Sequence, residues 1–481
     1  MFINQTTLAN GLRLVHAEVP DTQMVALCVL YHVGAINEDH DHTGWAHLLE
    51  HLMFEGTPRV TDYDTQVQLA GGENNAFTNN DITSFYVTVP RVNMEKLFFL
   101  ESDRMSGISL DEQSVQVQKQ VVIEEFKQRN LNHPYGDVQH LLRALAFRVH
   151  PYRWPTIGIE PSHIEKATPD DIRAFYHRYY HPSNAVLAVT GAISWEEAQS
   201  LADQYFGPLG NGELQLNGEL NDNSQFPIEP PQDRMRRKHV RRDVPLDMLV
   251  MAWHMPSRFD ADFSVCDAIT DLLANGLSSR LNLHLVQQRP LFNSIDAYIS
   301  GSADPGLIHV IGRLNPGVTL PDAERAVWQE INQLKHEPVG EYELNKVRNR
   351  FESERVFNNI NYLNVAIALA QHVIYGTTPD GLSGNDDCGQ MSAWLMLSSM
   401  GFYPVDPVSG EYVLGAPQME RIVLQLSGGK KLTVEAKGIS EHNKYVRRIL
   451  WNGKAYKKAT ISHKLLSQGG TLTFEMSNTH P

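Results

Sequence analysis

The sequence has few cysteines and no long apolar run. Only three cysteines occur in 481 residues, and Cys28, Cys266 and Cys388 are far apart and form no CxxC pair. We therefore expect neither disulfide bonds nor a cysteine-based zinc site, and a reducing compartment suits the chain. No uninterrupted apolar segment reaches the length of a membrane-spanning helix, so we expect no membrane segment.

Positive charge is also in deficit. The formal net charge is −15 at pH 7, which argues against nucleic acid as the main partner. One local exception is RMRRKHVRR, residues 234–242, which we interpret as the solvated entry into a strand that follows a linker. The first residues lack a basic region followed by an apolar run, so we predict no signal peptide and a cytoplasmic protein.

Length and pattern together predict several domains, because 481 residues are too many for one compact core. Strand-like and helix-like stretches alternate over residues 1–212, which predicts a two-layer α/β domain. The composition of residues 213–235 is typical of a linker, and the α/β pattern restarts over residues 236–371. From Glu411 onward, short strands joined by Gly and Asn-Gly turns predict a β sandwich or part of one.

The stretch GWAHLLEHLMFEGT, residues 44–57, is the strongest sign of chemistry. On a helical wheel its side chains separate into a polar stripe of His47, Glu50, His51 and Phe54 and an apolar face of Trp45, Leu48, Leu49 and Leu52. Histidines four positions apart lie one helical turn apart, so both rings can bind one zinc ion. A carboxylate directly before the second histidine can hold and deprotonate an attacking water. The alternative is a helix whose histidines are merely solvated.

A hydrolytic zinc site usually has three protein ligands, and QKQVVIEEF, residues 118–126, offers Glu124 and Glu125 in a second helix. This pair of helices resembles the inverted zinc peptidases, the pitrilysin, insulin-degrading and mitochondrial-processing-peptidase family. The resemblance covers residues 1 to about 370 and is also carried by YHVGAINE, GGENNAFTNNDITSFYVTVP, HPYRWPTIG and GLSSRL. It implies an endopeptidase with one zinc ion per chain, Glu125 as the third ligand and Glu50 as the general base.

The same resemblance implies further roles. Gln118 stands where the family has an upstream glutamate, and a glutamine can hydrogen bond behind the ligands but supplies no negative charge. The backbone of a peptide substrate is expected to pair with a strand through the positions Asn75, Ala76, Phe77 and Thr78. We expect a homodimer or a related partner subunit, and Gln118 keeps a catalytically weak partner subunit of the same fold open as an alternative.

Residues 372–481 resemble a different family, the calcium-dependent α-1,2-mannosidases of glycoside hydrolase family 92. GLSGNDDCGQMSAW, LSSMGFYPVDP and GEYVLGAP carry this resemblance. It implies a general-base role for Asp386 and Asp387, but the general acid and the calcium ligands belong to family segments that this chain lacks. We therefore expect this motif to be inactive, with calcium bound only if the mannosidase part were complete, and an α-mannosidase fragment stays the second functional hypothesis.

The two resemblances meet near Ala370 without a linker, which we interpret as a fusion or a chimeric gene product. The second α/β repeat is predicted to lack its final helix and strand, and this leaves an exposed sheet edge. The expected fold class is therefore α+β. It comprises two tandem two-layer α/β domains, the second truncated, followed by a mostly β C-terminal segment.

Overall fold

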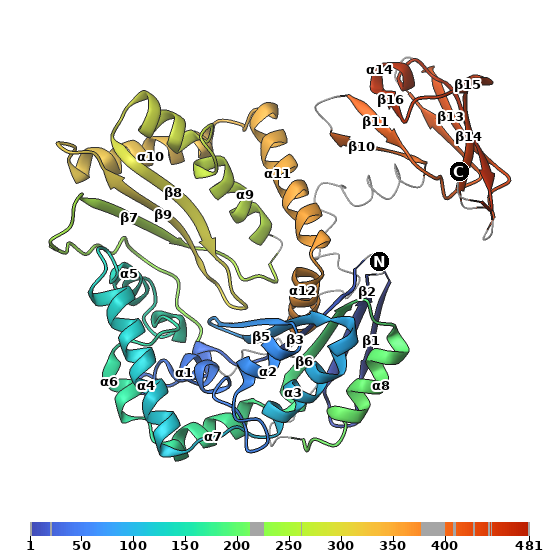
Figure 1. The fold of residues 1–481 in the computed structure, drawn as a ribbon. Helices are drawn as coiled ribbons and strands as arrows, with labels where there is room; N and C mark the ends of the chain where they lie inside the picture. The colour runs from blue at the N-terminus through green and yellow to red at the C-terminus, as the bar shows by residue number, and fades with distance from the viewer. Residues whose placement is uncertain are drawn as a thin grey trace. The chain divides into compact units, whose positions relative to one another are not determined.

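The structure, a computed structural model, describes residues 2–19, 22–211, 226–260, 262–376, 400–406, 410–426, 429–440, 443 and 445–479. The chain divides into two compact units, Met1–Ser383 and Gly384–Pro481 (Figure 1). The first unit mixes helices and strands and the second is mostly β, as expected from the sequence. The exact limits of the domains and of the linker stay predictions.

A six-stranded sheet forms the centre of the first domain. Its strands are β1 (Ile3–Thr7), β2 (Arg13–Glu18), β3 (Met24–Tyr31), β4 (Glu73–Thr78), β5 (Thr83–Pro90) and β6 (Ala185–Gly191). They lie in the order β1-β2-β6-β3-β5-β4, so β4 is an edge strand. Strand β6 runs parallel to β2 and antiparallel to β3. Because β3 and β6 are buried along nearly their whole length, both faces of the sheet need cover.

Helices cover one face of this sheet and build the main apolar core with it. The helices of the first domain are α1 (Trp45–Leu52), α2 (Tyr63–Leu69), α3 (Met94–Ser106), α4 (Glu112–Phe126), α5 (Val138–Ala146), α6 (Pro161–Lys166), α7 (Pro169–Tyr179) and α8 (Trp195–Tyr205). Short turns of helix add η1 (Ala35–Asn37), η2 (Arg91–Asn93), η3 (Lys127–Leu131), η4 (Pro151–Arg153) and η5 (Pro182–Asn184). Thr168 caps α7 by accepting a hydrogen bond from the amide of Asp171.

The opposite face of the first sheet is covered by a helix from much later in the chain. Helix α12 (Tyr362–Ile374) packs on β2, β3 and β6, and Figure 1 shows it beside these strands. Its buried residues Ala366, Leu369 and Ala370 share an apolar cluster with Cys28 and Leu30. The sequence placed residues 362–371 in the second domain, whereas their packing puts them in the core of the first. The expected seam near Ala370 thus falls inside a buried helix.

The second domain contains a smaller sheet with β7 (Met248–His254), β8 (Phe292–Ser300) and β9 (Leu307–Leu314) in the order β7-β9-β8. Its helices are α9 (Phe263–Ala274), η6 (Asn282–Gln288), α10 (Leu320–His336) and α11 (Glu341–Ile360). Helix α9 ends just before Gly276, whose φ of +78° is a left-handed conformation that ends helices. This domain is partial, as the sequence predicts.

The C-terminal unit consists of two sheets around one apolar core. The three-stranded sheet has the order β10 (Phe402–Asp406), β11 (Glu411–Leu414), β16 (Thr460–Ser462). The five-stranded sheet has the order β12 (Arg421–Gln425), β13 (Lys431–Lys437), β17 (Gly470–Ser477), β14 (Tyr445–Trp451), β15 (Lys454–Tyr456), and α14 (His463–Leu466) follows β16. Asn452 and Gly453, with φ of 48° and 78°, form the predicted hairpin turn. Asp386 and Asp387 lie outside the described residues.

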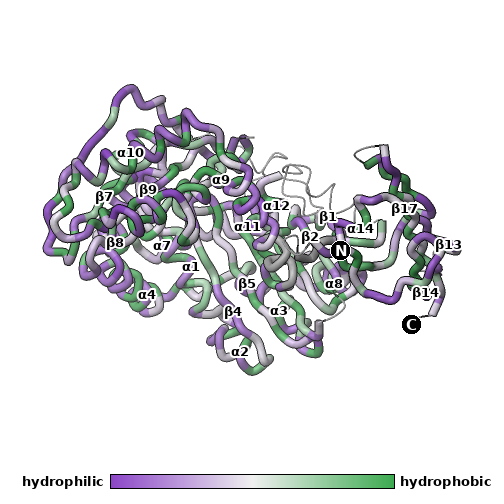
Figure 2. Tube along the Cα trace, turned by 90° about the horizontal axis from the view of Figure 1, so that it is seen from above, coloured by the Kyte–Doolittle hydropathy of each residue, from purple (hydrophilic) through white to green (hydrophobic). Residues whose placement is uncertain are grey.

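Apolar and polar positions are interleaved along the elements of both units. Figure 2 shows hydrophobic stretches (green) and hydrophilic stretches (purple) side by side on most helices and strands. Among the residues that the structure describes, no helix combines the length and the apolar composition needed to cross a membrane.

Candidate metal centre

Helix α1 is fixed at its N-terminus by a buried carboxyl group. The two oxygens of Glu38 accept hydrogen bonds from the amides of Gly44 and Ala46, each at 2.8 Å. Because the first amides of a helix have no partner within it, this carboxyl group stabilises the beginning of α1 by accepting their hydrogen bonds. Burial raises the pKa of Glu38 to about 8, against the hydrogen bonds of these amides, which lower it.

The two faces of α1 separate largely as the sequence predicts. Leu48, Leu49 and Leu52 are buried, and His47, Glu50 and His51 lie on the other side. Phe54 is a correction to the predicted polar stripe. The helix ends at Leu52, so the wheel no longer applies, and the Phe54 ring packs in the core against Tyr63 and Phe85, with centroid distances of 5.7 and 5.9 Å.

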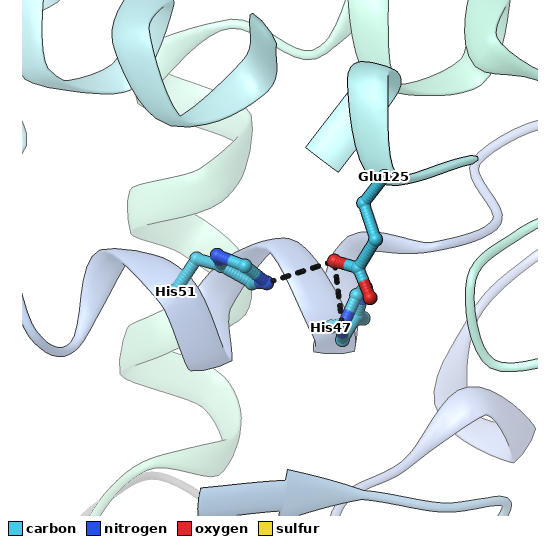
Figure 3. Close-up of side chains that lie close together, drawn as sticks. All are labelled: His47, His51 and Glu125. Carbon is cyan, nitrogen blue, oxygen red and sulfur yellow. Dashed lines mark ion pairs between the residues drawn. The ribbon is translucent and has the colours of Figure 1, made fainter. Parts of the chain in front are cut away.

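Helix α4 packs against α1 and brings Glu125 to the two histidines. The Nε2 atoms of His51 and His47 lie 3.4 and 3.8 Å from Oε2 of Glu125, and Figure 3 shows the three side chains converging from the two helices. One potential ligand atom from each residue lies within 4.8 Å of the others. In the described part of the chain, no other group of three His, Cys, Asp or Glu side chains meets this criterion.

The geometry and the protonation states fit a zinc ion. Ligand atoms of a tetrahedral zinc site, bound at about 2.0–2.1 Å, lie about 3.3 Å apart, close to the spacing seen here. Burial, together with the neighbouring His51, lowers the pKa of His47 to about 4, so its ring is neutral at neutral pH. A hydrogen bond with His51 lowers the pKa of Glu125 despite its burial, and the charges of His47 and Arg129 act in the same direction. Neutral imidazoles and an ionised carboxylate are the forms that bind a metal.

The side chain of Glu50 extends from α1 to the edge strand β4 of the sheet. Its Oε2 accepts a hydrogen bond from the Thr78 hydroxyl at 2.5 Å, and Thr78 is the last residue of β4. Burial raises the pKa of Glu50, against this hydrogen bond, which lowers it. The structure thus joins one predicted substrate-binding residue to the predicted general base.

The other three residues predicted to contact substrate, Asn75, Ala76 and Phe77, lie along the same edge strand. Strand β4 pairs with β5 on one side, and no strand of the described residues pairs with its other side. Asn75 is exposed, and its side-chain oxygen accepts a hydrogen bond from the amide of Ala76 at 2.8 Å. Their contact with substrate stays a prediction.

Gln118 lies two turns before Glu125 on α4, and its side-chain amide donates a hydrogen bond to Glu55. Sequence reasoning missed Glu55, which lies beyond the end of α1 at Leu52. It also missed Arg129, whose guanidinium lies 2.9 Å from Oε1 of Glu125. Spacing was a usable signal for Arg129, because it lies four positions after Glu125.

Comparison with known proteins gives three family matches. The family described as "Insulinase (Peptidase family M16)" matches residues 13–159, and that described as "Peptidase M16 inactive domain" matches residues 166–351. A shorter stretch, residues 360–478, matches the "Glycosyl hydrolase family 92 catalytic domain".

Individual relatives agree with the first two matches. The chain is 29% identical over 372 residues to a protein of Helicobacter pylori named zinc protease PqqE, covering 76% of this chain and 82% of the relative. It is 23% identical over 461 residues to a probable mitochondrial-processing peptidase subunit beta of Arabidopsis thaliana, covering 93% and 81%.

Among solved structures, a protease from Helicobacter pylori matches with a TM-score of 0.72 and 28% identity, covering 78% of this chain and 90% of that chain. A peptidase M16 inactive domain from Pseudomonas fluorescens matches with a TM-score of 0.70 and 16% identity, covering 82% and 92%, which shows the likeness of the fold. Together these matches show that residues 13–159 and 166–351 are similar to the M16 family of zinc proteases.

Proposed function

We propose that the chain is a zinc-dependent endopeptidase that binds one zinc ion through His47, His51 and Glu125. The observation that carries the proposal is the convergence of these three side chains from α1 and α4. Helix α1 carries the first two in the order His-x-x-Glu-His, which is the inverted form of the zinc-peptidase motif. The similarity of the chain to proteins named zinc proteases supports the same activity.

Glu50 is the proposed general base. A zinc ion at the three ligands would polarise a peptide carbonyl and make water more acidic. Glu50 takes the proton from the attacking water and passes it to the leaving amine nitrogen. The hydrogen bond from Thr78 restricts the rotation of the Glu50 carboxylate, which keeps one oxygen free to accept that proton.

The edge strand β4 is the proposed site of the substrate backbone. An extended peptide can add to an open sheet edge through main-chain hydrogen bonds, which gives affinity with little sequence preference. Since Thr78 ends β4 and contacts Glu50, a peptide paired along Asn75, Ala76 and Phe77 would run toward the general base.

The test is the Glu50→Gln variant, with Glu124→Gln as the matched control. Glu124 precedes Glu125 on α4, is exposed and pairs with Lys127. We expect Glu50→Gln to retain zinc by metal analysis and to lose hydrolysis of a fluorogenic peptide, while Glu124→Gln keeps both. Undiminished hydrolysis by zinc-loaded Glu50→Gln protein would refute the role of Glu50.

Two alternatives have their own tests. A catalytically weak partner subunit, as a homodimer or with a related chain, would bind zinc without cleaving peptides alone, and addition of the partner would restore hydrolysis. A glycosidase activity is supported by the match over residues 360–478. Release of mannose from an α-1,2-linked disaccharide, dependent on Asp386 and Asp387 and on added calcium, would favour it.

A further inference from the structure

Strand β7 is an edge of the second sheet, and its outer side has no partner strand among the described residues. The amide of Leu314 donates to the carbonyl of Asp247, and at the other end of β7 the amide of Met255 donates to Gly306. Hydrogen bonds alternate along an antiparallel pair, so these two bonds fix which residues face β9. The backbone groups that face away from β9 are those of Met248, Val250, Ala252 and His254.

Comparison with the first sheet indicates which strand would pair with the open edge of β7. Strands β7, β9 and β8 repeat the antiparallel pairing of β3, β5 and β4. In the first sheet, β6 lies between β3 and β2. Arg237 precedes the first residue of β7 by eleven positions, as Arg13 precedes the first residue of β3. Residues 237–242 therefore take the place of β2 in the chain, and β6 has no counterpart among the described strands of the second domain.

A groove of about 1210 Å³ lies along this edge. It is larger than the roughly 300–1,000 Å³ of small-molecule pockets, so its size suits a peptide. Its walls are β7, residues 231–244, the beginning of α10 and helix α5. Helix α5 contributes an apolar stripe to the groove, and none of its side chains is fully buried. The stripe consists of Val138, Leu141, Leu142 and Leu145. An occupant of the groove would cover this stripe and the open edge together.

The segment of residues 234–242 makes one wall of the groove strongly positive. It contains six arginines and lysines and no carboxylate, in a chain of net charge −15. Two of its arginines anchor it, since Arg237 pairs with Glu324 on α10 and Arg242 pairs with Asp137 beside α5. Within the described residues, no ion pair forms to Arg234, Lys238 or Arg241. These cations favour an occupant that carries negative charge.

We propose that this groove binds an extended segment of a partner protein, apolar in its middle and acidic at its ends, which adds to β7 as an antiparallel strand. The direction follows from β6, which runs antiparallel to β3. The apolar middle follows from β6, which is buried at all seven positions, and from the uncovered stripe on α5. The acidic ends follow from the positive charge of residues 234–242, which attracts carboxylates. Such strand addition uses main-chain hydrogen bonds for affinity and side-chain pockets for specificity.

The first test uses a peptide copied from the chain's own strand β6. The probe is Glu-Glu-Ala-Val-Leu-Ala-Val-Thr-Gly-Glu-Glu, that is, residues 185–191 between pairs of glutamates. Fluorescence anisotropy with the full chain, in EDTA so that the peptide stays intact, should show saturable binding. Hydrogen exchange should then slow at the amides of β7. Absence of saturable binding up to 1 mM, or slowed exchange only at the β4 edge, would overturn the proposal.

Matched variants separate the groove from the rest of the surface. Leu142→Asp on α5 should weaken binding at least tenfold, since burial of a leucine contributes about that much. Leu277→Asp, at a leucine that is 80% exposed outside the groove, should not weaken it. Lys238→Glu should weaken binding about fivefold, unlike Lys457→Glu at an exposed lysine of the C-terminal unit. Equal effects of a variant and its control would contradict the proposal.

Two further outcomes bear on the occupant. A probe with lysines in place of its glutamates should bind the wild-type chain more weakly, which tests the basic wall without any change to the protein. A self-associated chain whose β7 amides are already protected, and do not respond to the peptide, would identify a second copy as the occupant and overturn the partner assignment. None of these readouts depends on peptide hydrolysis, so they would stand even if Glu50 proved not to be the general base.

Discussion

Replacement of Leu369 by alanine should loosen α12 from the sheet of the first domain. Leu369 is only 2% exposed, in one apolar cluster with Cys28 and Leu30. The change removes three carbon atoms, which at about 0.8 kcal/mol each amounts to about 2.4 kcal/mol. The cavity left behind raises the cost to about 3–4 kcal/mol.

Cys28 provides the assay because its thiol lies beneath α12. The thiol is fully buried, and burial raises its pKa to about 12, so a disulfide reagent can reach it only when the cluster opens. An opening made easier by about 3 kcal/mol should speed labelling on the order of a hundredfold. Leu277→Ala, at an exposed leucine, is the control and should leave the rate unchanged. Equal Cys28 labelling rates in the two variants, resolved from Cys266 and Cys388 by mass spectrometry, would refute the packing role of α12.

Two predictions concern the residues that hold the site in place. Thr78→Val removes the hydrogen bond to Glu50, so kcat for peptide hydrolysis should fall about tenfold at unchanged zinc content. The control Thr78→Ser should retain activity. A change in KM alone would contradict this positioning role. The pKa of Glu38 is about 8 in the folded chain against an ordinary 4.5, so the folded state holds a proton that the unfolded state releases between these values. The free energy of unfolding should therefore fall as pH rises toward 8, and urea denaturation of Glu38→Gln should show a smaller fall; equal pH slopes would contradict the assignment.

Local patterns predicted the parts of the site that lie on single elements. The apolar spacing of Leu48, Leu49 and Leu52 fixed which side of α1 is buried, and therefore where His47 and His51 point. The structure brings Glu125 to them and Thr78 to Glu50, while the roles that the resemblance implies for these residues stay proposals. The end of the helix was less predictable, because nothing near Phe54 in the sequence shows that the wheel stops at Leu52.

Packing between distant segments could not be predicted from one sequence. The apolar residues of α12 indicate a buried helix, but no local pattern tells which sheet covers it. The role of Glu38 could not be predicted for the same reason. It depends on the folded position of this loop residue, where the amides of Gly44 and Ala46 at the beginning of α1 donate to it. Strand β8 differs from these cases, because its partial alternation of buried and exposed residues is a local signal.

We propose that Glu125, and not its neighbour Glu124, completes a zinc site with the two histidines. Zinc content per chain, measured after dialysis against a weak chelator, tests it in the variants Glu125→Ala and Glu124→Ala. Glu125 is 19% exposed beside His47 and His51, whereas Glu124 is 56% exposed and pairs with Lys127. If Glu125 completes the site, one zinc ion per chain should remain in Glu124→Ala and almost none in Glu125→Ala. Full zinc content in Glu125→Ala, or its loss in Glu124→Ala, would contradict it.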